Sequence, residues 1–268
     1  MDATGLLDKI PLWGVFLASL TITFLSMEFG FRAGKRKRRR LTGEKEIQAG
    51  PFVAASLSLL AFMLAIVFGN VQSRVHEVKQ VALDEANAIG TAYLRADLLP
   101  AAERTEIRQL LYDYVSLRIE AVEASTQPQF EQASDRAEAI QIDLWSRAAT
   151  FADQRPTPIA ALVVASVNDL IDLYEMRIAL AFRYRLPGII WPVLFGVAIL
   201  AMAMGGYATG LTGSRQFIAI TLSAASVFSV VLLVVVSLDR PQENLERITL
   251  PTMRDLQESI RSSMQSQP

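Results

Sequence analysis

The chain has 268 residues, a nearly balanced formal charge of −1 and no cysteine. Its hydrophobic fraction of 51% and its mean hydropathy of +0.30 exceed those of an ordinary soluble domain, so an integral membrane protein is predicted. The lack of cysteine excludes disulfides, thiolate metal sites and thiol catalysis.

Four apolar segments have about the ~20 residues that a helix needs to cross a bilayer. They cover residues 11–31, 51–69, 188–206 and 217–238. The predicted fold class is therefore all-α, a polytopic membrane protein with four transmembrane helices. The lipid bilayer is its first expected partner.

A cluster of basic residues follows the first apolar segment and sets the predicted topology. Loops rich in Lys and Arg remain on the cytoplasmic side, so this cluster and the turn between the last two segments are predicted to lie inside. Both termini and residues 71–186 are then extracytoplasmic, in a bacterial inner membrane. No aromatic side chains interleave with the basic residues for stacking on bases, which disfavours a nucleic-acid partner. The topology determinants are Arg32, Lys35, Arg36, Lys37, Arg38, Arg39, Arg40 and Arg215.

The long polar region, residues 71–186, carries twelve basic and seventeen acidic side chains. Apolar residues recur through it at helical spacing. The second span is predicted to continue as one helix to Leu99, and three further helices follow, the last capped by Thr157. They cover residues 101–124, 128–153 and those from 158 onward. Together they predict an extracytoplasmic four-helix bundle that is continuous with spans 2 and 3.

The predicted organisation has four parts. Residues 1–70 hold the first two spans and the basic hairpin, 71–186 the bundle, 187–238 the last two spans, and 239–268 an extracytoplasmic tail. Apolar residues of the tail also recur at helical spacing, which predicts an amphipathic helix packed on the bundle and interrupted at Pro251.

One carboxylate, Glu28, lies within the apolar segments. A membrane carboxylate is a functional candidate, but Arg32 follows at i+4 near the inner interface, so a snorkelling ion pair is the favoured interpretation. Gly30 and Gly34 have the spacing that lets two membrane helices approach closely.

Residues suited to catalysis are sparse. The lone His76 cannot form a histidine metal site by itself, and acidic neighbours such as Asp84 and Glu85 are typical of a charged helix surface. No serine occurs in a nucleophile-elbow pattern. An enzyme is therefore not predicted, and no cofactor or metal is expected.

Polar residues near the predicted membrane surface suggest a different role. Arg177, Arg183 and Arg185 precede the third span and could attract anions to a pore mouth. The alternative is that they pair with acidic residues or meet lipid headgroups; the acidic candidates are Asp172, Glu175 and Asp239. Asn87 and Gly90 give a predicted helix a small surface that would let another helix approach. Glu28, Asn87 and these three arginines are the candidate pore or vestibule residues.

Three motifs carry a resemblance to a known family. They are EANAIGTAYLRADLLP at 85–100, LIDLYEMRIALAFRYRLPG at 170–188 and TGLTGSRQ at 209–216. With the arrangement of spans, they make the chain similar to the bestrophin-like membrane proteins of bacteria and plants, a family of unknown function. Because bestrophins are oligomeric anion channels, the resemblance implies a homo-oligomeric ion channel. Bestrophins place their large helical region in the cytosol, whereas the charge distribution here predicts it outside.

Two functional hypotheses follow. The first is a homo-oligomeric bestrophin-like channel for small ions, with anions favoured over cations. The second is an extracytoplasmic sensory or scaffold subunit without enzymatic activity, which would need a signalling partner inside the cell.

Overall fold

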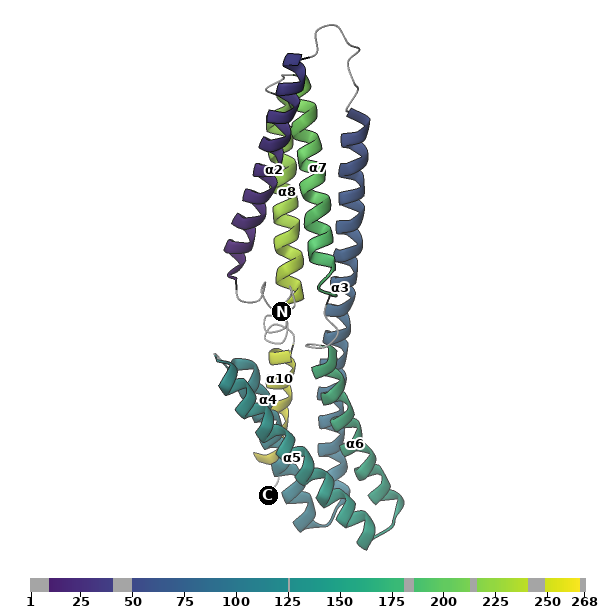
Figure 1. Ribbon diagram of the computed structural model, residues 1–268. Helices are drawn as coiled ribbons and strands as arrows, with labels where there is room; N and C mark the ends of the chain where they lie inside the picture. The colour runs from purple at the N-terminus through teal and green to yellow at the C-terminus, as the bar shows by residue number, and fades with distance from the viewer. Residues whose placement is uncertain are drawn as a thin grey trace. The chain divides into compact units, whose positions relative to one another are not determined.

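The computed structural model describes residues 10–40, 50–124, 126–180, 186–212, 216–240 and 249–265. Regular structure in these ranges is helical throughout, with no strand, as predicted (Figure 1). The elements are α2 (Leu12–Arg40), α3 (Gly50–Arg95), the 3-10 helix η1 (Ala96–Leu98), α4 (Ala101–Glu123), α5 (Gln127–Gln154), α6 (Pro158–Ile178), α7 (Ile190–Thr212), α8 (Gln216–Asp239) and α10 (Leu250–Gln265).

The chain divides into two compact units. The membrane unit comprises Met1–Ser73 and Leu186–Arg240, and the bundle unit comprises Arg74–Arg185 and Pro241–Pro268. Helix α3 contributes to both, because its 46 residues are more than twice the ~20 that cross the hydrocarbon layer. Its apolar residues, 51–69, belong to the membrane unit. The part of α3 that begins at Arg74 therefore lies beyond the membrane-spanning segment.

Four helices are long and apolar enough to cross a membrane: α2, α3, α7 and the part of α8 at Leu222–Asp239. The prediction of four spans is thereby confirmed. The predicted loop at the basic run is wrong, because residues 35–40 form the last turns of α2, which ends at Arg40. Lys and Arg are good helix formers, and their charge is favourable at a helix C-terminus. The run therefore lengthens the helix.

Helices α2 and α7 approach each other through four glycines. A Cβ added at Gly30 or Gly34 would overlap the backbone of α7, and one added at Gly206 or Gly210 would overlap the backbone of α2. The close approach predicted from Gly30 and Gly34 is confirmed, and the glycines of α7 supply the matching half. The core of the membrane unit consists of apolar side chains, including Leu60, Val67, Leu194, Met202, Phe228 and Leu232.

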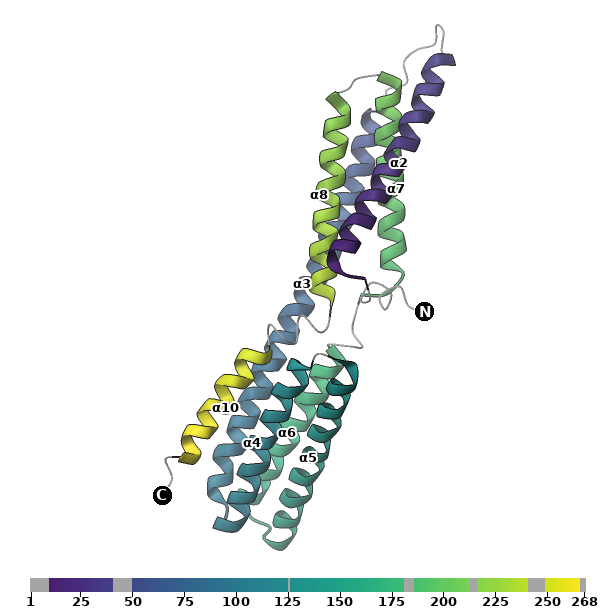
Figure 2. The same cartoon turned by 90° about the vertical axis from the view of Figure 1, so that its left-hand side faces the viewer.

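Helices α4, α5 and α6 and the later part of α3 lie side by side in the bundle unit (Figure 2). Apolar residues of all four helices form its core, and the helices confirm the helical assignment of this region. Central members of the core are Ile89, Ile107, Leu111, Leu144, Val167 and Leu170.

The tail forms α10, which packs on the bundle as predicted. Met253 and Ile260 are buried in the core of the bundle unit, and Nε2 of Gln257 donates to Oγ of Ser116 on α4 at 2.9 Å. The predicted interruption at Pro251 stays a prediction, because residues 241–248 lie outside the described residues. This proline lies in the first turn of α10, where its missing N–H removes no helical hydrogen bond.

The cap at the start of α6 is also confirmed. Oγ1 of Thr157 accepts a hydrogen bond from the N–H of Ala160 at 3.2 Å, whereas Thr126, at the same position before α5, makes no side-chain cap hydrogen bond. We expect Thr157→Ala to lower the free energy of unfolding by about 1 kcal/mol and Thr126→Ala to change it much less. Chemical unfolding followed by circular dichroism measures both. Equal losses would contradict the assignment of the cap.

Candidate functional site

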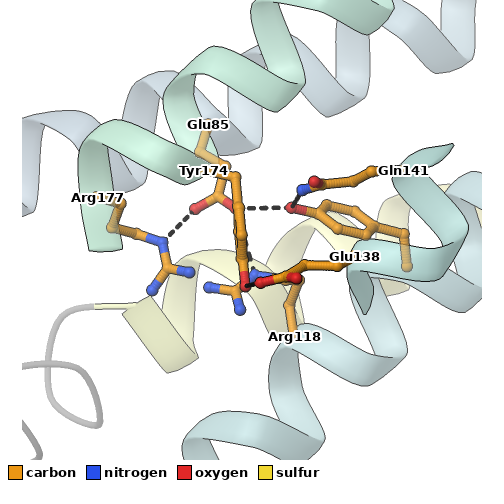
Figure 3. A network of polar contacts seen from close by, with 7 residues as sticks. Glu85, Arg118, Glu138, Gln141, Tyr174 and Arg177 are labelled. Carbon is orange, nitrogen blue, oxygen red and sulfur yellow. Dashed lines mark hydrogen bonds and ion pairs between the residues drawn. The ribbon is translucent and has the colours of Figure 1, made fainter. Parts of the chain in front are cut away.

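Three charged side chains from three helices meet inside the bundle unit, and we call them the ion-pair cluster: Glu85 of α3, Arg118 of α4 and Arg177 of α6 (Figure 3). Nε of Arg118 donates to Oε1 of Glu85 at 3.3 Å. Nε of Arg177 lies 2.7 Å from Oε2 of Glu85, an ion pair whose angle falls outside hydrogen-bond geometry. Glu85 is fully buried, and each arginine side chain exposes only 1% of its surface.

Two tyrosines and a glutamine surround the ion-pair cluster. The hydroxyl of Tyr114 donates to Oε1 of Glu85 at 3.2 Å and accepts from Nε2 of Gln141 at 3.0 Å. The guanidinium carbons of Arg118 and Arg177 lie 4.9 and 5.6 Å from the ring centre of Tyr174. Cation–π attraction of this kind is strengthened where water is excluded. The four helices of the bundle are thereby joined by one polar network.

Burial is the largest influence on the pKa values of Glu85, Tyr114 and Tyr174. It raises the pKa of Glu85 above its usual value, and the Arg118 guanidinium and the Tyr114 hydroxyl oppose that rise. Burial likewise raises the pKa of Tyr114 and raises the pKa of Tyr174 to about 12. Both tyrosines are therefore neutral at pH 7, and the cluster consists of two guanidinium groups and one carboxyl group.

A separate buried arginine provides a comparison within the same unit. Arg108 of α4 forms an ion pair with Asp97 of η1, and its guanidinium carbon lies 4.4 Å from the ring centre of Tyr93. Arg108 therefore has a carboxylate partner of its own, separate from Glu85.

The structure separates the residues predicted for a pore or vestibule. Arg177 is buried in the bundle and contacts Glu85, so its partner is none of the three acidic residues considered from the sequence. Glu28 pairs with Arg32 at 2.7 Å, the favoured interpretation. Asn87 is exposed on α3. Arg183, Arg185 and the topology determinant Arg215 lie outside the described residues.

Sequence reasoning missed Glu85 and Arg118 as partners. A signal was present, because each interrupts an apolar helix face: Glu85 shares its face with Ala82 and Ile89, and Arg118 shares its face with Leu111 and Tyr114. A charged residue in such a position predicts a buried ion pair, although it does not name the partner.

The family of the chain is decided by a comparison with family models. The model described as "Bestrophin-like domain" matches residues 17–242, most of the chain. The protein belongs to the bestrophin-like family. No curated protein and no solved structure gave a significant match.

The region matched to this bestrophin-like family includes the whole ion-pair cluster. It begins within α2 and ends after α8. Glu85 and Arg177 come from the first two of the three motifs that carried the resemblance, and the fold brings those motifs into direct contact. Helix α10 packs on the same unit but follows the matched region.

Proposed function

We propose that this bestrophin-like protein is a homo-oligomeric ion channel in which anions are favoured over cations. The observation that carries the proposal is the family match over residues 17–242, combined with four helices that can cross a membrane. We propose the inner membrane of a bacterium as its location.

The interior of the membrane unit supports a pathway between copies of the chain. One copy has an apolar core, in which the buried hydroxyl of Thr23 donates to the carbonyl of Ser19 in its own helix at 2.8 Å and the buried hydroxyl of Ser229 has no hydrogen-bond partner among the described residues. An ion that crossed such a core would lose its water and find few polar groups to replace it. A conducting pathway is therefore expected along an axis shared by several copies.

We further propose that both termini and residues 71–186 are extracytoplasmic, as the positive-inside rule predicts. Because the chain has no cysteine, single cysteines can report the orientation. An impermeant maleimide applied to intact cells should label Gln132→Cys, which is exposed on α5, and should not label Gly50→Cys at the start of α3. The reverse labelling would place the bundle in the cytosol.

The vestibule residues are proposed from their sequence positions. Arg183 and Arg185 directly precede the non-helical residues 186–189 before α7, where they could attract anions to a pore mouth. The burial of Arg177 makes that residue part of the bundle core in each copy. Asn87 and Glu28 stay candidates that a mutation series in the conductance assay can test.

The proposal predicts conductance from the purified full-length protein in planar bilayers. With unequal chloride concentrations on the two sides, the reversal potential should approach the chloride equilibrium potential. Light scattering on the same preparation checks the assembly and gives the number of copies. An assembled oligomer that conducts neither anions nor cations over the whole voltage range would overturn the channel function.

The bundle unit supports one alternative, an extracytoplasmic sensory or scaffold subunit. A sensor switches between two packing arrangements, and a buried polar cluster in a helical bundle can make these two arrangements distinct. Such a subunit needs a partner, so it would remain silent in bilayers and would be recovered from native membranes with a second protein in fixed proportion.

A further inference from the structure

The ion-pair cluster holds more positive than negative charge where water does not reach. Arg118 and Arg177 share one carboxylate, that of Glu85. The excess is one positive charge when Glu85 is ionised and two when it is protonated. An uncompensated charge in a protein interior is strongly unfavourable. The positive charge of the two arginines is therefore not fully compensated within the cluster, whether Glu85 is ionised or protonated.

The described neighbours do not supply the missing negative charge. Tyr114 and Tyr174 keep their protons at pH 7, because burial raises the pKa of both hydroxyls. Glu138 accepts a hydrogen bond from Tyr174 at 3.3 Å, but it is exposed on α5. In the described part of the chain, Arg118 and Arg177 form their ion pairs with Glu85 and none with Glu138.

Both arginines also have an unused donor. Nη2 of Arg118 and Nη2 of Arg177 are buried and have no hydrogen-bond partner among the residues that the structure describes. Their Nε atoms face Glu85, and Figure 3 shows their amino nitrogens on the side away from that carboxylate. A buried donor without an acceptor carries a desolvation cost. The same two side chains thus lack both an acceptor and a negative charge.

We propose that a small monovalent anion, chloride, binds the free Nη2 donors of Arg118 and Arg177 inside the bundle unit. One chloride would cancel the excess charge beside an ionised Glu85 and accept hydrogen bonds from both guanidinium groups. The near-complete burial of the two side chains excludes a large organic anion. The site lies outside the membrane-spanning segments and does not depend on conduction.

Chloride binding to the folded bundle should stabilise it by mass action. The test is thermal unfolding of the full-length protein in detergent, with chloride replaced stepwise by gluconate at constant ionic strength. We expect the midpoint to rise by about 5 °C and to saturate. A flat midpoint in the wild-type protein overturns the proposal.

Matched variants separate binding at this site from a general salt effect. Arg177→Met and, independently, Arg118→Met leave one cation beside Glu85, so the chloride-dependent rise should disappear in each. Arg108→Met removes a buried arginine whose ion-pair partner is Asp97 and which is not part of the ion-pair cluster, so it should keep the rise. The same rise in the wild-type protein and in both cluster variants overturns the proposal.

Discussion

Glu85→Ala should lower the free energy of unfolding of the bundle unit by about 3–5 kcal/mol. The substitution leaves Arg118 and Arg177 buried without their shared carboxylate, and an uncompensated buried cation costs far more than a lost surface contact. Hydrogen exchange of the full-length protein in detergent measures the change, because it reports the opening of each helix separately. The loss should appear in α4, in α6 and in the part of α3 that begins at Arg74, and it should spare the helical segments of the membrane unit.

The control for this change is an exposed ion pair on the same bundle. Arg136 and Glu120 lie 3.5 Å apart with more than half of each side chain exposed, so Glu120→Ala should cost less than about 1 kcal/mol. Arg177→Met should cost less than Glu85→Ala, since it leaves one cation facing one carboxylate. If Arg177→Met proves more costly than Glu85→Ala, the charge balance assigned to the cluster is wrong.

Gly206→Leu should separate α2 from α7 and destabilise the membrane unit by about 3 kcal/mol. A side chain at Gly206 meets the backbone of α2 around Met27, which cannot yield as a flexible side chain can. Leucine is a good helix former and is apolar, so neither the helix nor its insertion should suffer. Unfolding in a titration with sodium dodecyl sulfate, followed by circular dichroism, measures the loss.

Gly196→Leu is the matched control, because it makes the same change in the same helix. A Cβ at Gly196 has no heavy atom within 4 Å, so the stability should stay close to that of the wild-type protein. Equal losses from both variants would mean that leucine disturbs α7 itself and that the contact with α2 is unimportant.

Local patterns in the sequence identified the helices and the apolar face of each. Runs of about 20 apolar residues identified the spans, and apolar spacing identified the four helices that continue beyond them. Thr157 marked the start of α6, and the amphipathic tail was recognised as α10. These features depend on residues within a few turns of one another, so they can be read without knowing what packs against them.

The ion-pair cluster was decided by tertiary structure. The sequence predicted Arg177 at a pore mouth and Glu85 on a charged helix surface, because a sequence does not show which helix lies against which. Glu85 and Arg118 are 33 residues apart and meet only because α3 and α4 pack in one register. The pairing also leaves two cations around one carboxylate, an imbalance that cannot be seen until all three side chains are placed.

The contact between α2 and α7 was determined partly by a local sequence pattern and partly by the tertiary structure. The spacing of Gly30 and Gly34 marked one helix surface as suitable for close approach, but nothing in that spacing selected its partner. Gly206 and Gly210 were selected by packing, since only glycine on both sides lets two backbones come this near. Composition and periodicity determined which surfaces of this protein are apolar, small or charged, whereas the three-dimensional fit of the helices determined which surfaces meet.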